Sequence, residues 1–216
     1  MARFTVFGAA ASGSVPVEAT LTLLGLPYDV VEAVTWESEA ARKRVEAVNP
    51  MRQVPALVLP SGDVMTESLA ILLYLADLHP EAGLAPLPTD PKRAAFLRWM
   101  AYVSAEIYAL FWIKGNALRI AASQDDAPRV IDQVHERIAH CWEQMDRQVT
   151  PSRYILGDTL TVLDLYVTVV SRFGPWRTRF YKAAPKLAEV VRRVDSDPRL
   201  QDLWAARYPF DEGWER

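Results

Sequence analysis

The sequence predicts two domains: an α/β domain over residues 1–79 and an all-helical bundle domain over residues 91–216, joined by a linker at residues 80–90. Strand-like and helix-like periods alternate through the first part, whereas no segment of the second part is convincingly strand-like. Between them, residues 79–91 hold four prolines, a density that predicts an extended linker and excludes a helix. A chain of 216 residues, half of them hydrophobic, has the material for one large domain or two.

The first domain is expected to follow the order βαβ, α, ββ, α. Pro27 follows the first helix, and Pro50 ends the second because a residue before proline disfavours α geometry. The Pro-Ser-Gly at residues 60–62 marks a hairpin. The expected strands cover residues 3–7, 28–34, 56–59 and 63–65, and the expected helices cover residues 15–24, 37–48 and 68–78.

The second domain is expected to hold about five helices. Pro91 suits the first turn of a helix, and Thr161 with Asp164 has the spacing of a capping box, with Asp in place of the usual Glu. The expected helices cover residues 90–122 with Gly115 as a candidate kink, 126–149, a segment that begins at 161, 185–194 and 198–206.

Composition excludes several classes of function. A net charge of −3 argues against a nucleic-acid binder, and no apolar run is long enough for a membrane span or a signal sequence. The single cysteine, Cys141, cannot form an internal disulfide, and the three histidines lack the spacing of metal ligands. We therefore expect a soluble cytoplasmic protein with no metal and no protein thiol in its chemistry.

Two motifs carry a resemblance that extends over nearly the whole chain. Gln53-Val54-Pro55-Ala56-Leu57, followed by residues 66–75 (TESLAILLYL), is similar to the glutathione-recognition block of the glutathione transferase superfamily. The resemblance implies a thioredoxin-like first domain, glutathione as cosubstrate, a role in detoxification and a homodimer. The first domain is nearest to the beta class.

The second domain leaves the class open. Its first long helix aligns with that of the beta class, but Ala101 and Tyr108 stand where that class has Asn and His.

The glutathione-binding residues are expected to be Gln53, Val54, Pro55, Glu67 and Ser68. Extended backbone at Val54 can pair with the cysteinyl backbone of glutathione, and the resemblance implies a cis Pro55. Free N–H groups at the start of the helix after Glu67 can bind a carboxylate, while the Glu67 side chain can meet the ammonium group. The alternative is that Glu67 and Ser68 only cap a helix.

A transferase must favour the thiolate of its cosubstrate, which a nearby hydroxyl and a helix N-terminus can stabilise. Ser12 and Ser14 lie in the turn before the first helix, and Ser12 falls where serine-type and cysteine-type members carry the residue that faces the sulfur. The alternatives are that Ser12 caps the helix and that a backbone donor contacts the sulfur.

The pocket for an apolar electrophile is expected to include Ala10, Tyr108, Trp112 and Trp176, although an aromatic stripe on a bundle helix is more often core. The leading hypothesis is a glutathione transferase that conjugates glutathione to this electrophile. The alternatives are a glutathione-dependent disulfide reductase and a non-catalytic binding protein of the same fold.

Overall fold

A four-stranded mixed sheet forms the first part of the chain in the computed structural model, which describes residues 3–173 and 177–209. The strand order is β2-β1-β3-β4, with β1 parallel to β2, and with β3 antiparallel to both β1 and β4. The elements are β1 (Phe4–Gly8), α1 (Val15–Leu23), β2 (Tyr28–Glu32), α2 (Glu39–Glu46), β3 (Ala56–Val58), β4 (Val64–Thr66) and α3 (Ser68–Leu78).

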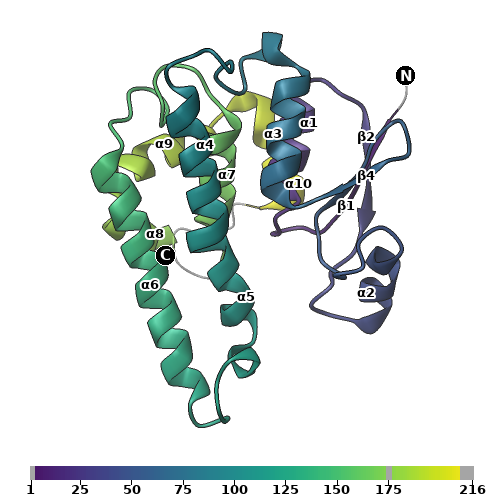
Figure 1. Ribbon diagram of the computed structural model, residues 1–216, viewed down its shortest axis with the longest axis vertical. Coiled ribbons are helices and arrows are strands. Elements are labelled where there is room, and N and C mark those ends of the chain that lie inside the picture. The colour runs from purple at the N-terminus through teal and green to yellow at the C-terminus, as the bar shows by residue number, and fades with distance from the viewer. Residues whose placement is uncertain (1–2, 174–176, 210–216) are drawn as a thin grey trace.

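The predicted order of these elements is confirmed, and no boundary moves by more than two residues. The start of α2 moves to Glu39 because Ser38 caps this helix, its hydroxyl oxygen accepting the Ala41 N–H at 3.1 Å. In Figure 1, α1 and α3 lie between the sheet and the helical part of the molecule, and α2 lies at the far end of the sheet.

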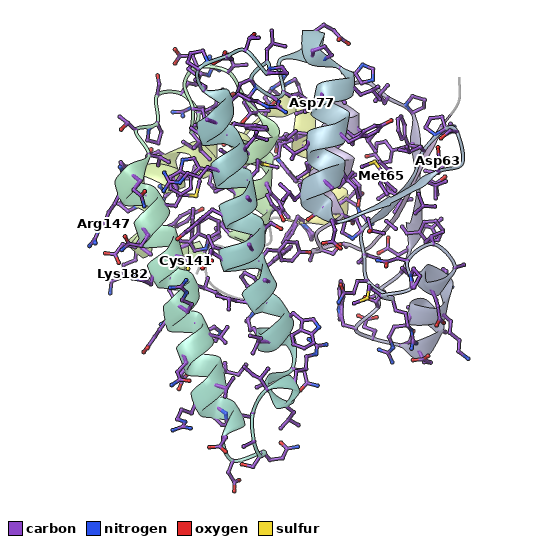
Figure 2. All side chains as sticks on the ribbon, viewed as in Figure 1. Asp63, Met65, Asp77, Cys141, Arg147 and Lys182 are labelled. Atoms are coloured by element: carbon purple, nitrogen blue, oxygen red, sulfur yellow. The ribbon has the colours of Figure 1, made fainter. Side chains whose placement is uncertain are left out.

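Helices make up the second part of the described chain. They are α4 (Arg93–Tyr102), a π-helical turn (Val103–Tyr108), α5 (Ala109–Gly115), α6 (Ala127–Gln148), α7 (Val162–Val170), α8 (Arg177–Ala183), α9 (Pro185–Asp195) and α10 (Gln201–Arg207). The α4–α5 rod and α6 form a long hairpin that projects beyond the rest of the domain (Figure 1). Cys141 lies on α6 (Figure 2) and is buried, as expected of a small hydrophobic side chain.

Three expectations about this part of the chain are wrong. The helix predicted over 90–122 begins at Arg93, contains the π-helical turn and ends at Gly115, because Asn116 is extended and its side chain caps a following 3-10 turn. The proline-rich linker holds a 3-10 turn, Pro80–Ala82, since proline is tolerated in a first turn where no N–H partner is needed.

The third error is α8, which the sequence does not suggest. No helix is expected over these residues, and the Arg177 side chain is buried against Asp195 of α9, with 2.7 Å between Nη1 and Oδ2. The other two short helices agree with expectation as α9 and α10, the latter preceded by a 3-10 turn.

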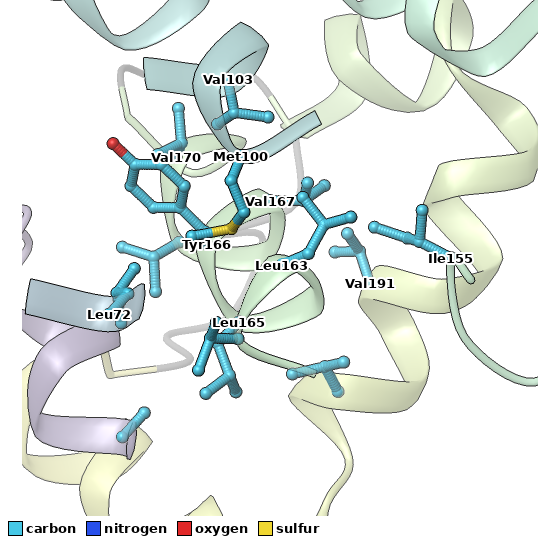
Figure 3. Packing of buried hydrophobic residues seen from close by; sticks show 14 of the residues in the cluster. Leu72, Met100, Val103, Ile155, Leu163, Leu165, Tyr166, Val167, Val170 and Val191 are labelled. Atoms are coloured by element: carbon cyan, nitrogen blue, oxygen red, sulfur yellow. The ribbon is translucent and has the colours of Figure 1, made fainter. Parts of the chain in front are cut away.

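One hydrophobic core runs through both parts of the molecule. Leu72 of α3, Met100 of α4 and Leu163 of α7 are fully buried in the same cluster (Figure 3). Because this apolar surface is shared, the sheet-bearing part cannot move against the helices without exposing it to water.

The predicted capping box at the start of α7 is confirmed. Asp164 is fully buried, and its carboxylate accepts hydrogen bonds from the Thr161 N–H at 2.8 Å, the Thr161 hydroxyl at 2.8 Å and the Ile155 N–H at 2.9 Å. The side chain therefore secures both a helix start and the preceding loop.

Replacing Asp164 with Ala should lower the free energy of unfolding by about 2–4 kcal/mol, because it removes a cap and leaves buried N–H donors without an acceptor. Denaturant titration followed by circular dichroism measures the loss. The control is Asp63→Ala in an exposed turn, expected to stay within about 0.5 kcal/mol of the parent. An equal, small loss in both variants would contradict this role of Asp164.

Burial also raises the pKa of the Asp164 carboxyl to about 6, against hydrogen bonds from Ile155, Thr161 and its own backbone that lower it. The folded state then holds this proton more tightly than the unfolded chain, so the contribution of Asp164 to stability falls as pH rises from about 4 to 6. Comparing the pH dependence of unfolding in the parent and in Asp164→Asn tests this, since the variant should lack that part of the fall.

Candidate functional site

Three segments meet at one end of the sheet because of the strand register. Phe7 near the end of β1 pairs with Ala56 at the start of β3, and Ala56 pairs with Thr66 at the end of β4. The turn after β1, the residues before β3 and the residues after β4 must therefore lie side by side. These segments contain all the residues predicted to bind glutathione and its sulfur.

Residues of α10 and β2 hold the turn after β1 in place. Ala11 has a positive φ of 55°, a conformation that non-glycine residues rarely adopt, and its N–H donates to the Arg207 carbonyl at 3.0 Å. The N–H of Ala10 donates to the Glu32 carboxylate at 3.1 Å. The turn is thus fixed by contacts with β2 and α10.

Ser12 and Ser14 form a hydroxyl pair within this turn, with 3.0 Å between their Oγ atoms. The Ser12 hydroxyl also contacts the Ala9 carbonyl at 2.7 Å and accepts the Ser14 N–H at 3.1 Å. Ser14 is fully buried, whereas Ser12 keeps 6% of its surface exposed. Of the two serines, only Ser12 keeps any exposed surface.

A buried carboxylate lies behind the pair. Glu18 of α1 is 1% exposed, and its Oε1 accepts the Ser14 hydroxyl at 2.8 Å. Arg207 of α10 forms an ion pair with it: Nη2 donates to Oε1 at 3.1 Å, and Nε lies 2.7 Å from Oε2 without the geometry of a hydrogen bond. Burial raises the pKa of Glu18, while Arg207 and Ser14 act in the opposite direction.

The segment before β3 has the geometry expected of an added-strand site. The Val54–Pro55 peptide bond is cis, as the resemblance implies. The Asn49 side chain donates to the Gln53 carbonyl at 2.8 Å and so holds the segment, while the Gln53 side chain is exposed. Within the described part of the chain, the N–H and C=O of Val54 make no hydrogen bond, so both can pair with an extended ligand.

Glu67 and Ser68 stand at the start of α3. Glu67 has a φ of 65° and makes no capping hydrogen bond, so simple helix capping does not account for it. Its side chain is exposed. Ser68 is buried, and its hydroxyl lies 3.0 Å from that of Tyr166 on α7, so Ser68 also links the two parts of the molecule.

Tyr108 reaches the same place from the helical part. Its hydroxyl lies against Gly13, where any Cβ would collide with it, so only glycine fits at this position of the turn. Burial raises the pKa of Tyr108, and the phenol therefore stays protonated at neutral pH. Its ring contacts those of Tyr166 and Phe173, with centroids 6.1 and 5.2 Å away.

The other residues predicted for the electrophile pocket are less closely gathered. Ala10 is exposed at the turn, and Trp112 is 48% exposed with the Arg119 guanidinium 4.5 Å from its ring centroid. Trp176 lies outside the described residues. Among the described residues of this set, Ala10 belongs to the turn and Tyr108 contacts it.

Glu18, Tyr166 and Arg207 are the site residues that sequence reasoning missed. Arg207 is 189 residues from Glu18, and Tyr166 is 98 residues from Ser68, so no local spacing connects these pairs. A signal did exist for Glu18, which is a lone acidic residue in an otherwise uncharged helix. Such a residue is buried only when paired.

Neither a metal site nor a membrane span is found where the structure is described. No group of three or more His, Cys, Asp or Glu side chains there could hold a metal ion. None of the helices there is both long and apolar enough to cross a membrane.

The chain is similar to known glutathione S-transferases over most of its length. Family models described as glutathione S-transferase, N-terminal domain and C-terminal domain match residues 14–78 and 118–207. The uncharacterized GST-like protein YncG of Escherichia coli K12 is 30% identical over 202 residues, which cover 92% of this chain and 95% of the relative.

Solved structures agree over the same length. The crystal structure of a glutathione transferase homologue from Sulfitobacter, with bound glutathione, has a TM-score of 0.82 at 27% identity and covers 95% of this chain and 99% of its own. A beta class enzyme of Sphingomonas chungbukensis has a TM-score of 0.75 at 25% identity, with 95% and 100% covered. The resemblance is confirmed: the chain belongs to the glutathione S-transferase family and has its fold.

Proposed function

We propose that this protein binds glutathione at the end of the sheet and transfers its thiolate to an apolar electrophile. The observation that carries the proposal is the register of β1, β3 and β4. It brings together the turn after β1, the backbone at Val54 and the start of α3, which suit the sulfur, the cysteinyl backbone and the γ-glutamyl end of glutathione. The Sulfitobacter homologue is described with bound glutathione, which supports the same ligand here.

Each part of glutathione has a partner in this arrangement. The backbone of Val54 pairs with the cysteinyl backbone, the helix N-terminus at Ser68 receives the γ-glutamyl carboxylate, and Glu67 receives the ammonium. These assignments put the sulfur at the turn after β1, where Ser12 is the less completely buried of the two serines.

Ser12 then stabilises the thiolate, with support from the N-terminal end of α1. Tyr108 covers the turn from the helical side, and with Phe173 and Phe111 it gives an aromatic wall on which an apolar electrophile can pack. Cys141 is buried on α6, and burial raises the pKa of its thiol, so the reactive sulfur is that of glutathione.

The protein should be retained on immobilised glutathione and should conjugate glutathione to an activated aryl chloride, measured by the absorbance of the thioether product. Turnover of hydroxyethyl disulfide with little conjugation would instead select the glutathione-dependent reductase, and binding with neither activity would select a binding protein. The absence of glutathione binding at millimolar concentration would remove the proposal. Sedimentation of the same sample tests the homodimer, and cell fractionation tests the cytoplasmic location.

Ser12→Ala should raise the pKa of bound glutathione thiol towards its free value of about 8.5 and lower kcat about 10- to 100-fold, because it removes a hydrogen bond to a charged acceptor. The ultraviolet absorbance of the thiolate, followed against pH, measures this pKa. Ser152→Ala, an exposed serine, is the control. An unchanged thiol pKa in Ser12→Ala would assign the sulfur to a backbone donor.

Glu67→Gln should weaken glutathione binding about 10-fold, since it removes the charge that faces the ammonium. Calorimetry with glutathione and with its deaminated analogue measures this interaction. The analogue should bind the parent about as weakly as glutathione binds the variant, and the variant should bind both ligands alike. A further loss when the variant meets the analogue would place the ammonium elsewhere.

A further inference from the structure

Each hydroxyl of the Ser12–Ser14 pair has a single proton, so the direction of the chain depends on what lies at its inner end. That end is Glu18, whose ion pair with Arg207 favours the ionised carboxylate: Nη2 donates to Oε1 at 3.1 Å, and Nε lies 2.7 Å from Oε2. An ionised carboxylate only accepts hydrogen bonds, so Ser14 is the donor in its 2.8 Å contact with Glu18, and the Ala9 carbonyl at 3.2 Å is the longer alternative for the same proton. The Ser14 oxygen is then an acceptor for both the Ala9 N–H and the Ser12 hydroxyl.

Ser12 is left with two inward acceptors for its proton, the Ala9 carbonyl at 2.7 Å and the Ser14 oxygen at 3.0 Å. Rotation of the hydroxyl moves the proton from one to the other. When Ser12 donates to Ser14, a continuous chain runs from Ser12 through Ser14 to Glu18, and the outer face of the Ser12 oxygen is an acceptor.

We propose that Glu18 accepts the thiol proton of bound glutathione through this chain of two hydroxyls. This inference rests on the proposed function, because it needs the sulfur at Ser12. The S–H proton passes to the Ser12 oxygen, the Ser12 proton passes to Ser14, and the Ser14 proton passes to Oε1 of Glu18. The products are a thiolate and a neutral carboxyl group, so the total charge of the cluster is unchanged.

The transfer also reverses the direction of every hydrogen bond in the chain. Glu18 then donates to Ser14, Ser14 donates to Ser12, and Ser12 donates to the thiolate. A hydroxyl that accepts the thiol proton thereby becomes the donor that the thiolate needs, without any heavy atom having to move. Hydrogen bonds in such a chain strengthen one another when all of them point in the same direction.

The charges around Glu18 permit it to become neutral. Arg207 of α10 also binds Glu32 of β2, with 2.8 Å between Nη1 and Oε2, so one guanidinium faces two carboxylates. If Glu18 takes a proton, Arg207 stays paired with Glu32. Tyr28, on the same strand as Glu32, faces Glu18 as well, and burial raises the pKa of both groups and so favours their neutral forms. Arg207 is thus a positioning residue that favours the ionised form of Glu18, against the burial that favours the neutral form.

The proton balance of glutathione binding tests the inference. In weakly buffered solution near neutral pH, an indicator dye counts the protons released and ultraviolet absorbance counts the thiolates formed. The parent protein should release far fewer protons than the thiolates it forms, because Glu18 retains them. S-methylglutathione, which has no thiol proton, gives the baseline.

Infrared difference spectroscopy supplies a second readout. Binding of glutathione to the parent should produce the carbonyl stretch of a protonated carboxyl group, and S-methylglutathione should not. Glu18→Gln should lack this band and release as many protons as it forms thiolates. Glu37→Gln, which changes an exposed glutamate outside the cluster, should behave as the parent does.

Ser14→Ala is the second variant, in case Glu18→Gln does not fold. It breaks the chain while leaving the Glu18–Arg207 pair in place, and it should likewise lose the band and release one proton for each thiolate. Equal proton and thiolate counts in the parent, with no carboxyl band, would overturn the inference and leave the proposed function intact. A parent that binds glutathione without forming thiolate would overturn the proposed function itself.

Discussion

The pairing of β3 with both of its neighbours is the constraint on which the site depends. Because Ala56 lies opposite Phe7 on one side and Thr66 on the other, the ends of three strands fall at one level of the sheet. A slip of one residue would turn alternate side chains to the opposite face and expose buried Val6 and Leu57, so the buried face fixes the register. The three segments of the candidate site are therefore placed by the packing of the sheet itself.

The helical part completes this end of the sheet with side chains that the first part lacks. Tyr108 comes from the π-helical turn, Tyr166 from α7 and Arg207 from α10. Hydrogen bonds of about 3 Å across such a boundary persist only if the two parts do not slide. The shared core supplies that rigidity, since Leu72, Met100 and Leu163 belong to one buried cluster (Figure 3).

Local signals allowed the sequence to predict most elements and one of the caps. Thr161 and Asp164 are three residues apart, so their contact can be foreseen from spacing, and the strands and turns of the first part follow hydrophobic period and proline positions. The contacts of Glu18 with Arg207 and of Arg177 with Asp195 join residues distant in sequence. The sequence gives no sign that Arg177 of α8 is buried, because an arginine is buried only with a partner and the partner here, Asp195, lies on another helix.

A serine pair needs a group of fixed character beside it, because a hydroxyl can equally donate or accept. Glu18 sets the direction of donation, and its protonation state can change. When Glu18 is ionised, Ser12 and Ser14 donate towards it; when Glu18 is neutral, it donates to Ser14 and the hydroxyls donate outward. The pairing of Arg207 Nη1 with Glu32 leaves the guanidinium one carboxylate partner in both states. The proton that leaves the glutathione thiol is thus the one that reverses the hydrogen bonds of Ser12, Ser14 and Glu18. Binding of glutathione thereby produces the arrangement in which Ser12 donates to the thiolate.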